Sequence, residues 1–279
     1  MQSSSLEDVY IHALSMAKKL PKPELGEDSI ISFSGGAEPP AFILYRALLH
    51  SGVKAQLASA SEVGVHIIPY RETGPLILFN VGEKDSRVIH TLEAASLLGI
   101  RAYLISPPMH PAYEEKVESL GVERILIDSR YPLLVMSLSS LFWSPRMMGG
   151  REGRFRAELG ELESAFSWIA SKIKGLDHKE ARNVNIVFYT PSMAPGAYYH
   201  CYTLPTCIQP AQLEYALRLG RGARGIAYIN GVEEHDYKDV IITTTLKGVK
   251  LSIVKLDTDP VTSGLYAILA AISLTGTIL

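Results

Sequence analysis

Apolar residues recur at helical spacing near the start of the chain and then give way to short apolar runs. Residues 6–20 place apolar side chains at i, i+3, i+4 and i+7 steps, which predicts a helix with one apolar stripe that stops at Pro21. The runs that follow are apolar throughout and alternate with helical patterns. They predict strands over residues 29–33, 53–58, 75–79, 102–105 and 124–127, and helices near 39–50, 60–68, 84–98, 112–120 and 131–143.

The alternation restarts after a charged helical stretch. Residues 146–182 carry the densest charge of the chain and a second apolar stripe from Phe155 to Ile173, so we expect a helical connector there. Beyond it the pattern predicts strands over 185–189, 225–229, 239–243 and 249–256, a proline-rich loop after the first, a helix near 210–219 and a final helix. The sequence therefore predicts an α/β protein of two subdomains, 1–145 and 183–279, each a parallel sheet flanked by helices in a flavodoxin-like three-layer α/β/α arrangement.

The final helix has a second reading as a membrane span. Residues 261–279 carry no charge and are long enough to cross a bilayer. They also contain several serine, threonine and glycine residues, end without a basic anchor, and follow Asp257, Asp259 and Pro260 as a helix start does. A buried helix is the favoured reading, and we expect no membrane partner.

Composition narrows the function classes. A chain of 279 residues with 47% hydrophobic content can bury a core, which excludes disorder. Lys plus Arg is 27 and Asp plus Glu is 29, so the net charge of -2 provides no field that would gather nucleic acid. Cys201 and Cys207 are too few for a disulfide framework, and the start lacks the pattern of a secretion signal. We expect an intracellular, cytoplasmic protein with reduced thiols.

Ligands of parallel α/β sheets bind at the carboxyl ends of the strands, so the loops that follow strands are the candidate sites. The first such loop holds Ser34, Gly35 and Gly36 before a helix start, where backbone N–H groups and the helix dipole favour an anion. A tight turn with Glu38 at the helix N-terminus is the alternative. The spacing matches neither a dinucleotide fingerprint nor a Walker motif.

The second loop occupies the same place one unit later. Glu83 and Asp85 put negative charge where a phosphate would dock, so they compete for the helix N-terminus. The candidate ligand contacts of this loop are Asn80, Gly82, Lys84, Ser86 and Arg87. A third loop, residues 190–196, either starts the crevice of the second subdomain or is a plain turn.

Titratable residues gather between two predicted strands at Glu233, Glu234 and His235. Aldose–ketose conversion needs a base that moves a proton between carbons and a group that opens the sugar ring, and Glu and His suit these tasks near neutral pH. A solvated acidic loop is the alternative. Arg130, at a helix start, could stabilise an anion or be an ordinary surface arginine. His200 with the two cysteines is too sparse a set for zinc, so we expect no metal.

The order of these parts resembles the sugar isomerase (SIS) superfamily over nearly the whole chain, and within it the archaeal bifunctional phosphoglucose/phosphomannose isomerase type. Residues 30–40, IISFSGGAEPP, resemble the family's Gly- and Ser-rich turn, and residues 52–63 its next strand and helix. Residues 75–106 resemble the strand, helix and strand that carry its phosphate loop. Residues 130–134, RYPLL, resemble its arginine-bearing helix start in inverted order, and residues 226–236 resemble the segment whose histidine opens the ring.

The chain departs from the family pattern at three places. The Ser-x-Ser-Gly-x-Thr phosphate grip is here residues 80–85, NVGEKD, which lack its three hydroxyl groups and add two carboxylates. Where the family has its glutamate base, residues 220–224 read GRGAR, and the family's C-terminal catalytic lysine has no counterpart. Loss of a general base costs about two to four orders of magnitude in rate. Glu233 or Glu234 is the candidate substitute.

The resemblance implies a phosphosugar isomerase-like protein, which interconverts aldose and ketose forms of a hexose phosphate such as glucose 6-phosphate or mannose 6-phosphate. His235 would then open the ring, Glu234 or Glu233 would move the proton, and Arg130 would stabilise the enediolate. The substrate would be held by Ser34, Gly35, Gly36, Asn80, Gly82, Lys84, Ser86 and Arg87. The resemblance also implies a homodimer and no metal or organic cofactor.

The alternative is a non-catalytic protein of the same fold that binds a sugar phosphate and regulates a partner. Arg221 and Arg224 favour this reading, because arginines at the base position can hold an anion but cannot abstract a carbon-bound proton.

Overall fold

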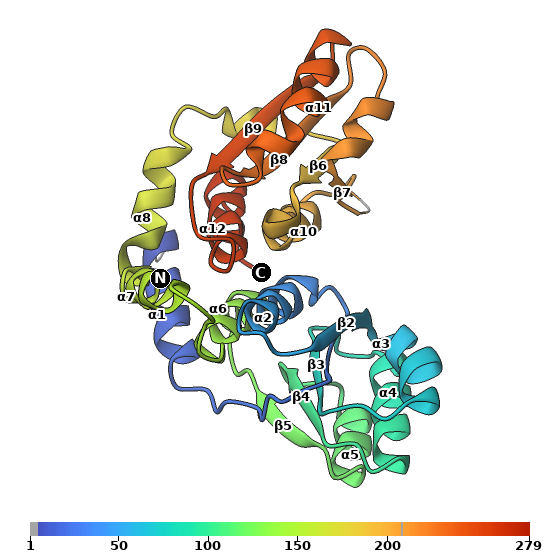
Figure 1. Ribbon diagram of the computed structural model, residues 1–279. Coiled ribbons are helices and arrows are strands. Elements are labelled where there is room, and N and C mark those ends of the chain that lie inside the picture. The colour runs from blue at the N-terminus through green and yellow to red at the C-terminus, as the bar shows by residue number, and fades with distance from the viewer. Residues whose placement is uncertain (1–4, 208) are drawn as a thin grey trace. The chain divides into compact units, whose positions relative to one another are not determined.

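The computed structural model describes residues 5–207 and 209–279. Its contacts divide the chain into two compact units. The N-terminal unit consists of residues 11–152 with Leu279, and the C-terminal unit consists of residues 153–278 with the described residues up to Tyr10. Figure 1 shows that each unit holds one β-sheet with helices packed beside it. Residues 153–182, which the sequence places in a connector, belong to the same unit as the second sheet.

Five parallel strands form the sheet of the N-terminal unit in the order β2-β1-β3-β4-β5. They are β1 Ser29–Ser34, β2 Ala55–Ser59, β3 Leu76–Asn80, β4 Ala102–Ser106 and β5 Glu123–Leu126. All five side chains of β3 and of β4 are buried, because helices cover both faces of a parallel sheet. The strands predicted from apolar runs are confirmed.

The helices of this unit lie in two layers (Figure 1). They are α1 Leu6–Ala17, whose residues up to Tyr10 belong to the C-terminal unit, α2 Glu38–His50, α3 Ala60–Glu62, α4 Ser86–Leu97, α5 Pro111–Ser119 and α6 Pro132–Phe142. Helix α2 packs against β1 and α6, whereas α4 packs against β3, β4 and α5. A π-helical turn, Val63–Ile67, and a 3₁₀ turn, Ile68–Tyr70, continue α3, so the helix expected near 60–68 is helical throughout but not regular.

Four parallel strands form the sheet of the C-terminal unit in the order β7-β6-β8-β9. They are β6 Ile186–Tyr189, β7 Ala211–Gln212, β8 Arg224–Asn230 and β9 Lys250–Leu256. The helices are α7 Arg151–Gly160, which belongs to this unit from Gly153 onward, α8 Leu162–Lys172, α9 His178–Arg182, α10 Ala194–Thr203, α11 Glu234–Leu246 and α12 Ser263–Thr275. Helices α10 and α12 contact the sheet together, and Tyr237 of α11 belongs to the apolar cluster that contains Phe188 and Ala227.

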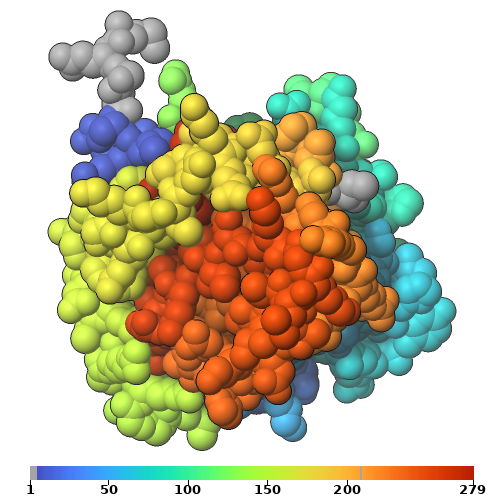
Figure 2. Space-filling model, turned by 90° about the horizontal axis from the view of Figure 1, so that it is seen from above, coloured from blue at the N-terminus to red at the C-terminus, as the bar shows by residue number. Residues whose placement is uncertain are grey.

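Two elements of this unit differ from the sequence expectation. The strand expected over 239–243 is wrong, because these β-branched residues belong to α11, most of whose side chains are exposed. Figure 2 shows the part of the surface to which α11 belongs: residues near 220–260, in orange and orange-red, lie on the face toward the viewer. The helix expected near 210–219 is strand β7 followed by a 3₁₀ turn, Leu213–Arg218. Tertiary context decides both cases against local propensity.

Helix α10 was expected to be a proline-rich loop. Pro195 lies in its first turn, where a helix tolerates proline because the backbone N–H has no helical partner. Gly196 follows, and a β-carbon there would lie 2.5 Å from the carbonyl carbon of Ala267 in α12. The glycine therefore lets the two buried helices approach closely.

Gly196→Ala is expected to lower the free energy of unfolding by about 2 kcal/mol, because the added methyl group forces α10 and α12 apart in a packed core. Gly160→Ala is the matched control, since Gly160 ends α7 and nothing lies within 4 Å of a β-carbon built there. Urea denaturation of both variants measures the difference. Equal stability of the two variants would contradict the close packing.

The buried reading of the last helix is confirmed. Almost every residue of α12 is buried, and Gly276, at a φ of 70°, ends the helix. Among the helices of residues 5–207 and 209–279, none is long and apolar enough to cross a membrane.

The expectation of reduced thiols is wrong. Cys201 of α10 and Cys207 form a disulfide with a sequence separation of 6, and their Cα atoms lie 5.1 Å apart. The end of α10 turns the chain back far enough for the two sulfur atoms to meet. The cytoplasmic location stays a prediction, and it no longer has reduced cysteines to support it.

Candidate functional site

The crevice of the N-terminal unit lies where the strand order reverses, between β1 and β3. Ser34 and Asn80 are register partners at the carboxyl ends of these two strands, and both are buried. The loops that follow them lead into α2 and α4. In open parallel sheets this reversal point is the usual place for a ligand.

The two loops touch at a pair of glycines. Gly35 has a φ of 64°, and a β-carbon there would lie 2.6 Å from the backbone nitrogen of Gly82. Asn80 fixes the second loop, because its side-chain nitrogen donates to the Gly82 carbonyl at 2.8 Å and its side-chain oxygen accepts from the Gly82 N–H at 3.0 Å. The structure therefore brings Ser34, Gly35, Asn80 and Gly82 together.

Asp85 is the N-cap of α4 and lies inside the crevice. Its side chain is only 6% exposed and accepts a hydrogen bond from the Ser34 hydroxyl at 2.6 Å. Arg87 donates three more hydrogen bonds to it, from the backbone N–H at 3.1 Å, from Nε at 2.8 Å and from Nη2 at 2.7 Å. The competition of a carboxylate for this helix N-terminus, expected from the sequence, takes place through Asp85.

Asp85 is ionised at neutral pH. Burial would raise its pKa, but hydrogen bonds from Arg87 and Ser34 and the charge of Arg87 outweigh burial, so the pKa lies below its usual value. The other candidate contacts of these loops, Lys84 and Ser86, are exposed, as is the carboxylate of Glu83. Gly36, with a φ of 95°, precedes α2.

The crevice of the C-terminal unit lies between β6 and β8, where that strand order reverses. Asn230 ends β8, and its side-chain oxygen accepts from the Val232 N–H at 2.9 Å. Glu233 follows and accepts from the Ser192 hydroxyl at 2.9 Å and from the Ser192 N–H at 3.1 Å. Ser192 lies in the loop after β6, which is thus part of the crevice and not a plain turn.

Glu234 and His235 begin α11 at the same edge of the sheet. An oxygen of Glu234 lies 2.7 Å from Nζ of Lys255 in an ion pair whose partners are both partly exposed. Glu234, His235 and Lys238 line a hollow of about 410 Å³ whose other walls include Ile229 and Ile253. The ring of His235 is exposed, so a ligand in this hollow can reach it.

Arg130 belongs to the N-terminal unit and is exposed two residues before α6. It lines a hollow of about 460 Å³ together with His12, Met16, Asp128 and Tyr131. The hollow lies beyond the carboxyl end of β5, at the same edge of the sheet as Ser34 and Asn80.

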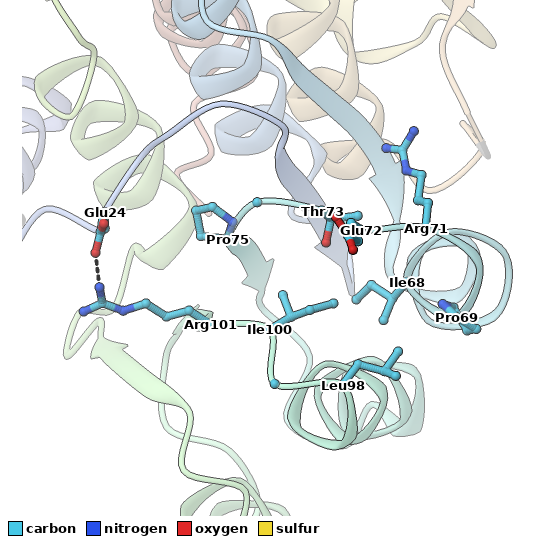
Figure 3. A pocket seen from close by; sticks show the side chains of 12 residues that line it. Glu24, Ile68, Pro69, Arg71, Glu72, Thr73, Pro75, Leu98, Ile100 and Arg101 are labelled. Atoms are coloured by element: carbon cyan, nitrogen blue, oxygen red, sulfur yellow. Dashed lines mark hydrogen bonds and ion pairs between the residues drawn. The ribbon is translucent and has the colours of Figure 1, made fainter.

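A larger hollow, of about 610 Å³, lies at the opposite edge of this sheet. Its walls come from the residues that precede β3 and β4, including Thr73 and Ile100. Figure 3 shows the ion pair of Glu24 and Arg101 at one end and Arg71 at the other. Because parallel sheets bind ligands at the carboxyl ends of their strands, the crevice between β1 and β3 remains the better candidate despite this volume.

Ser192 and Thr190 are functional candidates whose roles the sequence did not resolve. Thr190 accepts a hydrogen bond from the Asn230 N–H at 3.2 Å, so both residues support the segment that carries Glu233. The sequence feature that could have indicated a role is the polar residue directly after an apolar strand. Arg221 and Arg224 are exposed before and at the start of β8. In the described part of the chain no three His, Cys, Asp or Glu residues gather closely enough to hold a metal ion.

No protein-family model matches the chain, and no curated protein sequence matches it. Solved structures do match it over nearly its whole length. Glucosamine-6-phosphate deaminase from Thermotoga maritima has a TM-score of 0.63 at 15% identity, with 97% of this chain and 90% of that one covered. Tagatose-6-phosphate ketose/aldose isomerase from Escherichia coli has a TM-score of 0.62 at 9% identity, with 97% and 87% covered.

The C-terminal domain of glucosamine-fructose-6-phosphate aminotransferase from Francisella tularensis gives a similar result, with a TM-score of 0.62 at 10% identity and coverage of 96% and 92%. At these identities the likeness is one of fold. The expected fold, two α/β subdomains that each hold a parallel sheet flanked by helices, is confirmed.

Proposed function

We propose that the chain is a phosphosugar isomerase-like protein that interconverts the aldose and ketose forms of a hexose phosphate such as glucose 6-phosphate or mannose 6-phosphate. The observation that carries the proposal is the position of His235 at the start of α11, at the carboxyl edge of a sheet, where it lines a hollow of about 410 Å³ together with Glu234 and Lys238. The similar structures named above support it, because each of those proteins is named for a hexose 6-phosphate.

Each residue has a defined task in this proposal. His235 transfers a proton to or from the ring oxygen of the sugar and so opens the ring. Glu234 or Glu233 moves a proton between adjacent carbons. Of the two, Glu233 is held in one orientation by Ser192. Arg130 stabilises the negative charge of the enediolate. The reaction needs no metal or organic cofactor, and the archaeal bifunctional type of isomerase is the family type we propose.

A second candidate is a non-catalytic protein that binds a sugar phosphate. Two observations favour it: both carboxylates near His235 already have partners, and the residues before β8 are the cations Arg221 and Arg224 instead of a base. A guanidinium binds an anion but does not accept a proton at neutral pH. We also propose a cytoplasmic homodimer, and a monomer in light scattering at micromolar concentration would contradict it.

Proton NMR in deuterated buffer separates the two candidates. With fructose 6-phosphate, glucose 6-phosphate or mannose 6-phosphate, an isomerase incorporates deuterium at the second carbon, and the Glu233→Gln, Glu234→Gln double variant loses this incorporation. Thermal stabilisation by the sugar phosphate without incorporation supports the binding protein. Absence of both signals for all three sugars would contradict the sugar phosphate assignment.

A further inference from the structure

Asp85 has no capacity left for a ligand. A carboxylate offers about four acceptor positions, and Asp85 uses four in the hydrogen bonds from Ser34 and Arg87. With its side chain 6% exposed, it is also shielded from water. It therefore acts as a bound anion that the chain supplies itself.

The groups that hold Asp85 are the groups that would hold a phosphate. A serine hydroxyl, a guanidinium and a backbone N–H in the first turn of a helix converge on one point at the end of two central strands. Helix N-termini and arginine forks are the common protein donors to phosphate oxygens. The Arg87 side chain is 57% exposed, so part of it faces solvent while its Nε and Nη2 atoms bind Asp85.

The same arrangement recurs in the C-terminal unit. There an asparagine again ends the central strand and accepts from the backbone N–H two residues later. An acid again accepts from a serine at the carboxyl end of the neighbouring strand, Ser34 as the last residue of β1 and Ser192 in the turn after β6. The counterparts of Ser34, Asn80 and Asp85 are Ser192, Asn230 and Glu233. The two units therefore share a carboxylate that accepts from a serine across the strand reversal, buried at Asp85 and half-buried at Glu233.

We propose that Asp85 determines the specificity of the crevice between β1 and β3: it occupies the position of a phosphate, and a phosphate monoester binds there only by displacing it. This inference rests on the proposed function, because it concerns how a sugar phosphate enters that site. Phosphate and the Asp85 carboxylate carry like charges, so they cannot share the donors. The unliganded crevice thus discriminates against phosphate monoesters.

The test uses inorganic phosphate as the probe and isothermal titration calorimetry as the readout. Asp85→Ser removes the internal charge and supplies a hydroxyl donor, and we expect it to bind phosphate about tenfold or more tightly than the unmodified protein. Asp177→Asn is the matched control, because Asp177 caps α9 through the N–H groups of Lys179 and Glu180 without closing a strand reversal. We expect no gain in that variant.

Asp85→Asn guards against a folding defect in the serine variant. It keeps the shape and one acceptor oxygen while it removes the charge, so it should also gain phosphate affinity. Circular dichroism confirms the fold of each variant before titration. Equal affinity in the unmodified protein and both Asp85 variants, or the same gain in Asp177→Asn, would overturn the proposal.

The outcomes for the inference and for the proposed function are distinct. Gain of phosphate affinity in the Asp85 variants, with no binding of any of the three sugar phosphates, supports the role of Asp85 and overturns the proposed function. The opposite outcome has two parts: the protein isomerises a sugar phosphate, and both Asp85 variants bind that sugar phosphate no more tightly than the unmodified protein does. This outcome supports the proposed function and overturns the role of Asp85.

Discussion

Isomerisation is expected to slow by about two to four orders of magnitude when His235 is replaced by alanine, the range typical of losing a positioned acid or base. His235 is exposed at the start of α11, where its ring borders the hollow that Glu234 and Lys238 also line. The variant keeps the backbone and both carboxylates, so the loss reports the imidazole. Deuterium incorporation at the second carbon, measured over time, gives the rate.

His90→Ala is the control for this experiment. His90 is an exposed histidine on α4, in the other unit, and has no place in the proposed chemistry. The control should keep the rate of the unmodified protein. If His235→Ala kept it as well, the ring-opening role of His235 would be wrong, and the segment after β8 would bind without catalysing.

Acid is expected to remove about 3 kcal/mol of stability between pH 6.5 and pH 4 through one buried residue, His200. His200 lies within α10, fully buried, with Nδ1 2.7 Å from the Tyr228 hydroxyl and Nε2 3.0 Å from the Ala181 carbonyl. The carbonyl can only accept, so Nε2 carries the proton and Nδ1 accepts from Tyr228. Burial raises the pKa of Tyr228 well above its usual range, so this hydroxyl keeps its proton.

The direction of the pH effect follows from the lowered pKa of His200. Burial lowers this pKa from 6.5 to about 4, whereas the unfolded chain keeps the ordinary value. Between these two values the unfolded state binds more protons, so the stabilisation is complete above pH 6.5 and is lost as the pH falls to 4.

Urea denaturation at pH 7.5, 5.5 and 4 measures the effect in the unmodified protein and in His200→Gln. Glutamine keeps a donor and an acceptor but does not titrate. The variant should therefore be less stable than the unmodified protein at pH 7.5, and its free energy of unfolding should fall by about 3 kcal/mol less between pH 7.5 and pH 4. Parallel pH profiles for the two proteins would contradict a neutral, buried His200.

The architecture was accessible from the sequence because buried parallel strands are apolar throughout. The strands β1, β3 and β4 stand out as such runs between helical patterns, and helices between consecutive strands indicate a parallel sheet. Helix α11 was mistaken for a strand because its Val, Ile and Thr residues favour strands locally. Helix α10 was missed because its Pro and Gly residues are typical of loops, and only the partner helix α12 explains them.

The candidate site was located in part. Spacing placed Ser34, Asn80 and Asp85 in two loops at the ends of strands, and a parallel sheet brings such loops to one edge. The sequence could not show which of Glu83 and Asp85 turns inward, because that depends on the hydrogen bond to Ser34 across the crevice. The partnership of Glu233 with Ser192 was hidden for the same reason.

The contacts of Tyr10 set an order of events during synthesis. Its hydroxyl donates to the carbonyl of Leu162 at 2.6 Å, 152 residues later in the chain, and its ring stacks on Phe166. A ribosome adds on the order of 5–20 residues per second, so Tyr10 waits roughly 8–30 seconds before its partner exists. The C-terminal unit, although it includes this early segment, can therefore complete its core only after the sheet of the N-terminal unit has been synthesised in full.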